Sequence, residues 1–300
     1  MLEVIRILGL LRQQGWRPLR TIQFVSWDAS EYNFIGSTEH VEANLEALRA
    51  DAVAYLNVGV GVSGDTFRAT GSPALGVALL RALDRVSDPF KNASLKEIWE
   101  QTSSKLGALG SDGDYAAFQD IAGCASLDIG FTGPAFPRHS CYDTFEWMQK
   151  FGDPTGAYHR MLAEVWVLII LELSQNPIIP LDLKTYSFAV KEYLTDLQTL
   201  AERKGSQSEG PRALNFAGIW EAANLFEHNA NEFHAWEDWW FGQVIGRGGF
   251  ENRVLQHARM DWNERVSQFD SNLLDLPVDK QDKDENHGVC SPVLLSRNHY

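Results

Sequence analysis

Cysteine and basic residues are scarce in this chain of 300 residues, and each scarcity excludes a class of protein. Only three cysteines occur, and they are far apart (Cys124, Cys141 and Cys290), so their spacing gives neither a zinc knuckle nor a disulfide framework. The 26 Lys and Arg are outnumbered by 40 Asp and Glu, which gives a formal net charge of −14. Because a nucleic-acid surface needs clustered Lys and Arg, we expect no nucleic-acid partner.

Long apolar runs are also lacking. The most apolar stretch, Val165 to Leu173, is far shorter than the roughly 20 residues that span a bilayer. The segment from Met1 to Leu8 carries Glu3 and has no long apolar core, so it is not a secretory signal. We therefore expect no membrane segment in this chain. Its hydrophobic content of 44% and charged content of 22% are those of an ordinary globular protein.

Strands and helices are expected to alternate in the first half of the chain. Short apolar runs predict strands over residues 21–26, 52–58 and 125–130. Apolar residues spaced three and four apart predict helices between them. This alternation predicts βαβ units and parallel strand pairing. The expected helices cover residues 2–14, 37–50, 73–86, 95–101 and 114–121.

The second half reads as helical throughout. Helices are predicted over residues 158–173, 183–203, 214–240 and 249–269. Pro177 and Pro180 separate the first two, and we place a domain boundary there, which gives an α/β domain over residues 1–176 and a helical domain over residues 177–276. The tail over residues 277–300 is charged and then loses periodicity, so we expect it to be disordered.

Two side chains are candidates for chemistry at the edge of the sheet. Glu31 follows the first predicted strand, and His139 lies on a loop after the third. Chemistry in open α/β sheets sits where strands end, and zinc accepts imidazole together with carboxylate. The alternative is that His139 is an ordinary hydrogen-bonded loop residue and that Glu31 simply bonds to it or to water.

Two further features allow a functional and a structural interpretation. The loop over residues 107–114 is rich in Gly and Asp, but it has neither the Lys-Ser/Thr pair of a P-loop nor the spacing of an EF-hand. We interpret it as a tight turn that caps the helix at Asp114. The aromatic cluster Trp236, Trp239, Trp240 and Phe241 is interpreted as packing, with a dimer interface as the alternative.

Several sequence blocks, in matching order and spacing, resemble the glutamate carboxypeptidase and transferrin-receptor branch of the zinc aminopeptidase-like peptidases. The likeness covers roughly residues 1–276 and extends to fungal vacuolar-sorting-peptidase-like proteins. The blocks that carry it include Ser26-Trp27-Asp28-Ala29, Gly36-Ser37-Thr38-Glu39, Asp114-Tyr115, His139-Ser140 with Tyr142-Asp143, and Trp262-Asn263 with Phe269-Asp270.

The resemblance implies an incomplete mixed sheet of the zinc-peptidase type, flanked by helices and followed by an all-helical dimerisation-like domain. It also implies a two-zinc site with a glutamate as general base, in a cleft that Gly110, Ser111, Asp114 and Tyr142 would line. A homodimer through the helical domain is the partner that it implies. Members of this branch are often membrane-anchored, vacuolar or extracellular.

When the family's site residues are matched to this sequence one by one, most of the zinc ligands and the general base are missing. Glu31 and His139 match two zinc ligands, whereas Ser30 stands at the position of the general base and Gly59 at that of a ligand Asp. Arg138 replaces an aromatic residue that usually precedes the histidine. The remaining ligands, a His and a bridging Asp, would lie before residue 1. We expect either a truncated gene model or pseudogene product, or a genuine short form that associates with a partner to cover the unpaired edge of the sheet.

We therefore predict a degenerate, non-catalytic relative that does not bind zinc stoichiometrically. The alternatives are a working zinc metallo-carboxypeptidase and a dimerising, receptor-like module.

Overall fold

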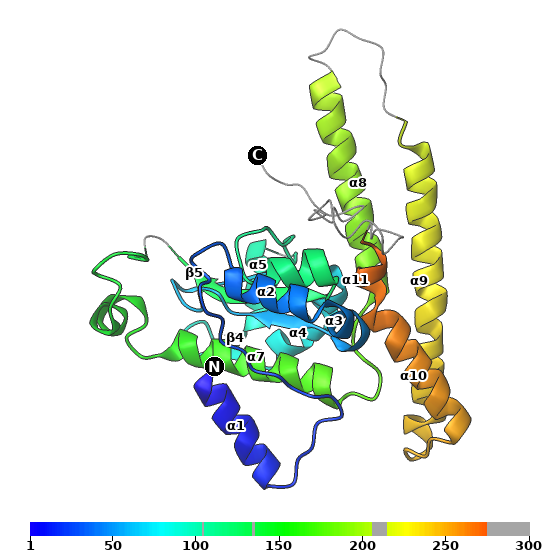
Figure 1. The fold of residues 1–300 in the computed structure, drawn as a ribbon, viewed down its shortest axis with the longest axis horizontal. Helices are drawn as coiled ribbons and strands as arrows, with labels where there is room; N and C mark the ends of the chain where they lie inside the picture. Colours follow the sequence, from blue (N-terminus) through cyan, green and yellow to red (C-terminus); the bar gives the residue numbers. More distant parts are fainter. Residues whose placement is uncertain (104, 134–135, 206–214, 275–300) are drawn as a thin grey trace.

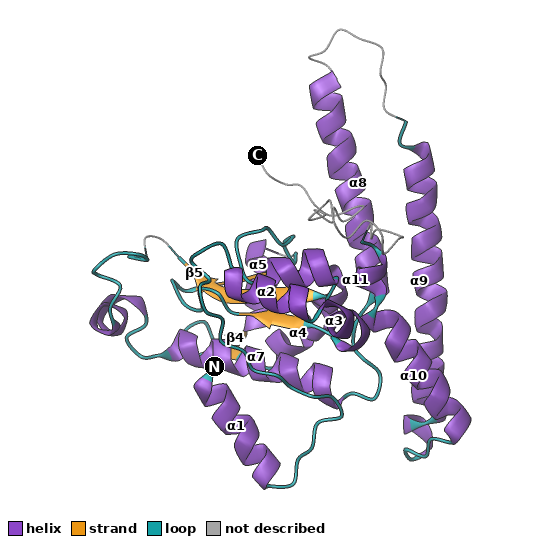
Figure 2. Ribbon diagram, viewed as in Figure 1, coloured by secondary structure: helices purple, strands orange, loops and turns teal. Residues whose placement is uncertain are grey.

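A computed structural model gives the fold, and it describes residues 1–103, 105–133, 136–205 and 215–274 (Figure 1). The predicted disordered tail lies outside these ranges. The first part of the chain holds a small sheet between helices, and the second part is helical (Figure 2). The elements of the first part are α1 (Leu2–Gln13), α2 (Ile35–Ala43), α3 (Leu45–Asp51), β1 (Tyr55–Asn57), β2 (Thr66–Gly71), η1 (Pro73–Leu75), α4 (Gly76–Asp84), β3 (Ser87–Asp88), β4 (Ala93–Ser94), α5 (Leu95–Ser103), η2 (Ala117–Ala122), β5 (Ser126–Thr132), α6 (Phe145–Trp147), η3 (Met148–Gly152) and α7 (Ala157–Gln175).

The main sheet is mixed and has the order β1-β5-β2, which confirms the expected fold class. β1 pairs with β5 in parallel, but β2 pairs with β5 antiparallel. The sequence pattern did not predict β2, and it favoured parallel pairing alone. Thr66–Gly71 lacks a continuous apolar run because Arg68 and Thr70 alternate with its buried residues, so its signal is that of a half-exposed strand.

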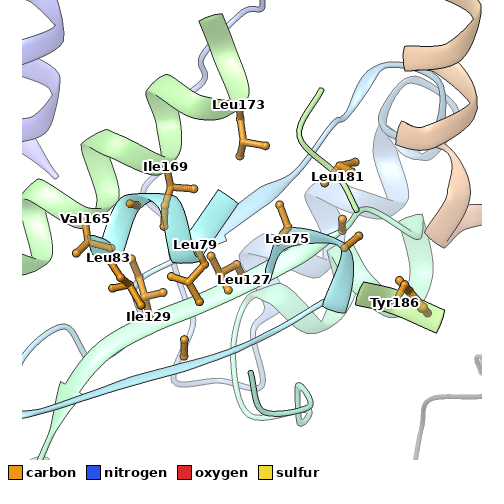
Figure 3. Close-up of a cluster of buried hydrophobic side chains, with 14 of the residues drawn as sticks. Leu75, Leu79, Leu83, Leu127, Ile129, Val165, Ile169, Leu173, Leu181 and Tyr186 are labelled. Atoms are coloured by element: carbon orange, nitrogen blue, oxygen red, sulfur yellow. The ribbon is translucent and has the colours of Figure 1, made fainter. Parts of the chain in front are cut away.

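Side chains of the sheet alternate between two faces, as the two-residue period of a strand requires. One face carries Leu127, Ile129 and Phe131 and belongs to the main hydrophobic cluster. Leucines of η1 and α4, and aliphatic residues of α7, point toward Leu127 and Ile129 (Figure 3). Each such leucine or isoleucine contributes about 1.5–3 kcal/mol when it is fully buried. The opposite face carries polar residues and positions the candidate site.

The predicted first strand over residues 21–26 is wrong. This segment is not assigned to a strand, and the partner of β1 in the sheet is β5. The apolar alternation has another cause, because Ile22 and Phe24 pack against the cluster of Val4, Leu8 and Ile170 between α1 and α7. An extended segment can therefore bury alternate side chains on helices without backbone pairing.

The predicted helix over residues 37–50 is interrupted at Asn44. The Asn44 side chain donates to the His40 carbonyl oxygen at 2.8 Å, and its backbone has φ −119°. A short amide side chain that competes for helical carbonyls in this way favours a break. α2 and α3 are therefore separate helices.

The helical part begins with a long antiparallel pair that stands away from the sheet (Figure 1). Its elements are α8 (Leu183–Gly205), α9 (Ala217–Gln243), η4 (Ile245–Arg247), α10 (Arg253–Ser267) and α11 (Phe269–Asn272). The predicted helix over residues 249–269 is thus shorter, because Asn252 caps its start by accepting from the Leu255 N–H at 2.9 Å. In the described part of the chain, no helix is long and apolar enough to cross a bilayer.

The aromatic cluster on α9 is divided between packing and exposure. Trp240 is buried, and Trp236 stacks with Trp262 of α10 at a ring distance of 6.2 Å. Trp239 and Phe241 are 48% and 38% exposed. Packing thus accounts for two of the four side chains.

Candidate functional site

Ser30 and Asp114 meet where the extended segment ends and α2 begins. The Ser30 hydroxyl donates to Asp114 Oδ2 at 2.9 Å, and the Ser37 hydroxyl donates to Asp114 Oδ1 at 2.7 Å. The connecting loop turns sharply, with positive φ at Ala29, Asn33 and other residues. Asp114 therefore acts as the acceptor that fixes this loop against the segment preceding η2.

Glu31 lies next to the loop that carries Arg138 and His139. Its Oε1 accepts from the Arg138 guanidinium at 3.2 Å, and its Oε2 lies 3.4 Å from His139 Nε2. All three side chains are at least half exposed, and His139 has φ +61°. The structure thus brings Glu31 and His139 together from distant parts of the sequence and adds a permanent positive charge beside the carboxylate.

Gly59 lies just after β1, next to the buried carboxylate of Asp128, which the hydrophobic pattern does not indicate as a site residue. Its N–H is 3.4 Å from Asp128 Oδ1, which also accepts from Asn57 Nδ2 at 2.7 Å. Arg68 of β2 donates to the other oxygen of Asp128 at 2.5 Å. The signal in the sequence was a lone charge inside the apolar run of β5, because such a residue must find partners when it is buried.

A tyrosine connects this carboxylate with the loop near Ser30. Tyr55 accepts a hydrogen bond from Trp27 Nε1 at 2.9 Å and donates to Asn57 Oδ1 at 3.2 Å. Its ring stacks on Phe118 with 4.0 Å between centroids. Burial, assisted by the carboxylates of Asp114 and Asp128, raises the pKa of Tyr55 to about 12. Tyr55 is therefore a neutral positioning group at ordinary pH.

The other predicted cleft residues lie on exposed loops. Gly110 and Ser111 belong to the turn before η2, where the Tyr115 hydroxyl donates to the Asp112 carboxylate. Tyr142 is 71% exposed, and its N–H donates to the Ser140 hydroxyl at 3.2 Å. Among the four cleft residues, Asp114 accepts a hydrogen bond from a predicted site residue, Ser30.

The donor set does not fit a two-zinc site. A catalytic zinc takes three protein ligands and keeps one open position. The described residues contain no group of three or more His, Cys, Asp or Glu side chains placed to hold a metal ion. Glu31 and His139 would offer two donors, and Arg138 already bonds one oxygen of Glu31.

The chain belongs to peptidase family M28, which it matches over residues 1–159. Residues 214–298 match the transferrin receptor-like dimerisation domain. This second match, together with the named relatives, places the chain in the glutamate carboxypeptidase and transferrin-receptor branch of the family, in which zinc is the metal.

Several named relatives share this branch. The chain is 41% identical over 205 residues to a probable glutamate carboxypeptidase of Arabidopsis thaliana, LAMP1, covering 66% of this chain and 30% of the relative. A second from the same plant, AMP1, is 36% identical over 98% of this chain and 40% of its own length. An inactive zinc metalloprotease of Schizosaccharomyces pombe is 31% identical over 92% of this chain and 34% of its own length. The chain therefore spans well under half the length of these relatives.

Proposed function

We propose that this chain is a non-catalytic member of peptidase family M28 whose helical part pairs with a second copy. One observation carries the first half of the proposal. Ser30, at the position of the family's general base, donates its hydroxyl hydrogen bond to Asp114. The family's general base must accept a proton from water, whereas the Ser30 hydroxyl that replaces it already donates a hydrogen bond to Asp114. The name of the inactive fission-yeast relative is consistent with such a loss.

The chemistry of the substitutions supports the loss of hydrolysis. A serine hydroxyl is a very poor proton acceptor near neutral pH, and general acid–base assistance is worth about 10²–10⁴-fold. Gly59 offers an N–H, which cannot ligate a cation, in place of a carboxylate. Both changes lie within this chain, so they act whatever precedes it.

The surroundings of Glu31 also disfavour a metal. Arg138 supplies a guanidinium that bonds to the same carboxylate that a cation would need. An always-protonated side chain at this distance repels a divalent ion and competes for its ligand. Glu31 and His139 then form a polar surface contact rather than a metal centre.

The test measures zinc content and peptide hydrolysis on the same purified chain. After incubation with zinc and gel filtration, we expect less than one zinc per chain by mass spectrometry and no release of product from an acidic dipeptide. The variant Ser30→Glu should also be inactive, because it restores the base without the ligands. Two zinc ions per chain together with turnover, in either protein, would establish the alternative of a working metallo-carboxypeptidase.

The second half of the proposal rests on the helical part. It matches a dimerisation domain, and α9 and α10 expose large apolar side chains such as Leu225 (59%) and Val254 (77%). Sedimentation at micromolar concentration should give a dimer, and Leu225→Lys should shift it toward monomer. Leu19→Lys, at a residue that is 63% exposed outside this part, is the matched control. A monomer for the unaltered chain would refute the pairing.

The domain division near residue 177 is part of this proposal. α7 ends at Gln175 and α8 begins at Leu183, while the main hydrophobic cluster continues across this boundary from α4 and α7 to α8 and α9. We expect residues 1–176 to form the α/β domain and residues 177–276 the helical domain. Proteolysis that cuts first between α7 and α8 would support this division.

A further inference from the structure

α11 connects the two parts of the molecule through three consecutive residues. Phe269 packs between α8 and α9, with its ring 5.1 Å from Tyr186 and 5.4 Å from Phe226. Asp270 and Ser271 face the α/β part, and Figure 1 places α11 between the sheet-bearing part and the long helices. This four-residue helix cannot be stable alone, because isolated helices need about 12–15 residues. Its order therefore reports its own docking against the rest of the molecule.

Asp270 is the polar contact at this junction. It is 5% exposed, and its Oδ2 accepts from the Ser72 hydroxyl at 2.8 Å. Its Oδ1 is buried and makes no geometrically ideal hydrogen bond within the described residues, although the Tyr186 hydroxyl lies near enough to the carboxylate to favour its ionised form in part. A carboxylate with one oxygen unsatisfied is costly to keep ionised away from water. The protonated form avoids that cost and keeps the bond from Ser72.

The neighbouring titratable groups stay neutral over the same pH range. Tyr186 of α8 and Cys124, just after η2, lie near the Asp270 carboxylate. Burial and this carboxylate raise the pKa of Cys124 to about 12 and that of Tyr186 well above its usual value. Of these three groups, Asp270 is the one that changes charge near neutrality.

We propose that Asp270 is a pH-sensitive latch, which holds α11 on the α/β part when it is protonated and loosens it when it is ionised. α11 is in close contact with the α/β part at this point. Gly123 has φ +70°, and a Cβ on it would lie 2.3 Å from the Ser271 Cα. A small movement of α11 therefore separates Ser271 from Gly123 and admits water to Asp270.

The direction follows from linkage. Burial raises the pKa of Asp270 from 3.8 to about 6 in the docked state, whereas an undocked, hydrated carboxylate keeps its ordinary value. The docked state then binds more protons between these two values, so docking weakens as the pH rises through them. Between pH 5 and pH 7.5, the equilibrium constant for undocking is expected to rise about tenfold.

Hydrogen exchange followed by mass spectrometry on the full chain tests the latch. The readout is the protection of peptides covering residues 269–274, corrected for intrinsic exchange at each pH. In the unaltered chain, protection should fall about tenfold from pH 5 to pH 7.5. Asp270→Asn cannot ionise and should show no fall. Asp261→Asn removes the same charge from an exposed position on α10 and should behave like the unaltered chain.

Ser72→Ala provides a second variant if Asp270→Asn does not fold. The bond from Ser72 favours the ionised carboxylate, so its loss should raise the pKa of Asp270 further and steepen the fall in protection. A constant protection in the unaltered chain would overturn the latch. So would an equal fall in Asp270→Asn, or a Ser72→Ala variant without a steeper fall.

Discussion

Arg68 of β2 and Asp128 of β5 form an ion pair across the antiparallel ladder, with 2.5 Å between Arg68 Nη1 and Asp128 Oδ2. Asp128 lies opposite Thr70 in this ladder, and Arg68 lies opposite Gly130. Both side chains therefore share the polar face of the sheet, where Asn57 and Gly59 also bond to Asp128. Asn57 and Tyr55 connect this ion pair by hydrogen bonds to Trp27, near the loop that carries Ser30.

Arg68→Ala should destabilise the fold by about 2 kcal/mol, because it leaves a buried carboxylate without its charged donor. The measurement is urea unfolding, and the double variant Arg68→Ala with Asp128→Ala should lose little more than the single one. Arg265→Ala, which removes an exposed ion pair on α10, is the matched control and should leave stability unchanged. An equal effect of the two arginine variants would contradict the structural role of Arg68.

Tyr55→Phe should cost about 1–2 kcal/mol, because the Trp27 N–H loses its acceptor while the ring keeps its stack on Phe118. Tyr142→Phe, at a residue 71% exposed, should cost nothing measurable. Thermal unfolding of both variants checks this. If Tyr55→Phe proved neutral, water would have to replace the hydroxyl at this position.

The hydrophobic pattern predicted the main helices well but could not locate the site's polar contacts. The periodicity that placed α7 and α8 depends on local burial of one helix face. The bonds from Ser30 and Ser37 to Asp114 join residues 84 and 77 positions apart, and no spacing rule links them. β2 escaped prediction because Arg68 and Thr70 interrupt its apolar residues. Residues 21–26 were predicted as a strand but do not form one. Alternating apolar side chains also occur where an extended segment packs on helices, so this pattern alone does not identify a strand.

Gly123→Ala should destabilise the chain far more than Gly156→Ala. Both glycines have left-handed backbones, with φ +70° and +67°. Gly156 has open space where a Cβ would be, so its substitution brings backbone strain of about 1–2 kcal/mol alone. At Gly123 the Cβ would also overlap the Ser271 Cα, so we expect at least twice that loss. Urea unfolding of the two variants separates backbone strain from steric overlap. Equal losses in the free energy of unfolding would show that α11 moves away from residue 123 at little cost.

Glu251→Gln should weaken the junction of α9 and α10 in a pH-dependent way. Glu251 accepts from Trp240 Nε1 at 2.9 Å and takes two bonds from Arg259, which also bonds to the Pro177 carbonyl oxygen. The bond from Arg259 holds the pKa of Glu251 below its usual value of 4.5. The stabilisation that this charge provides is therefore present above pH 4.5 and is lost as the pH falls through the lowered pKa.

The variant should cost about 1–2 kcal/mol at pH 7, as expected for hydrogen bonds to a charged group. The difference from the unaltered chain should begin to shrink as the pH falls below 4.5, where the unfolded chain binds a proton at Glu251, and should be lost once the pH passes below the lowered pKa of the folded chain. Urea unfolding at pH 7 and pH 3.5 measures both values. A cost that stays the same at the two pH values would mean that the substituted amide fails through shape and not through charge, and the ion pair with Arg259 would then contribute nothing to the junction.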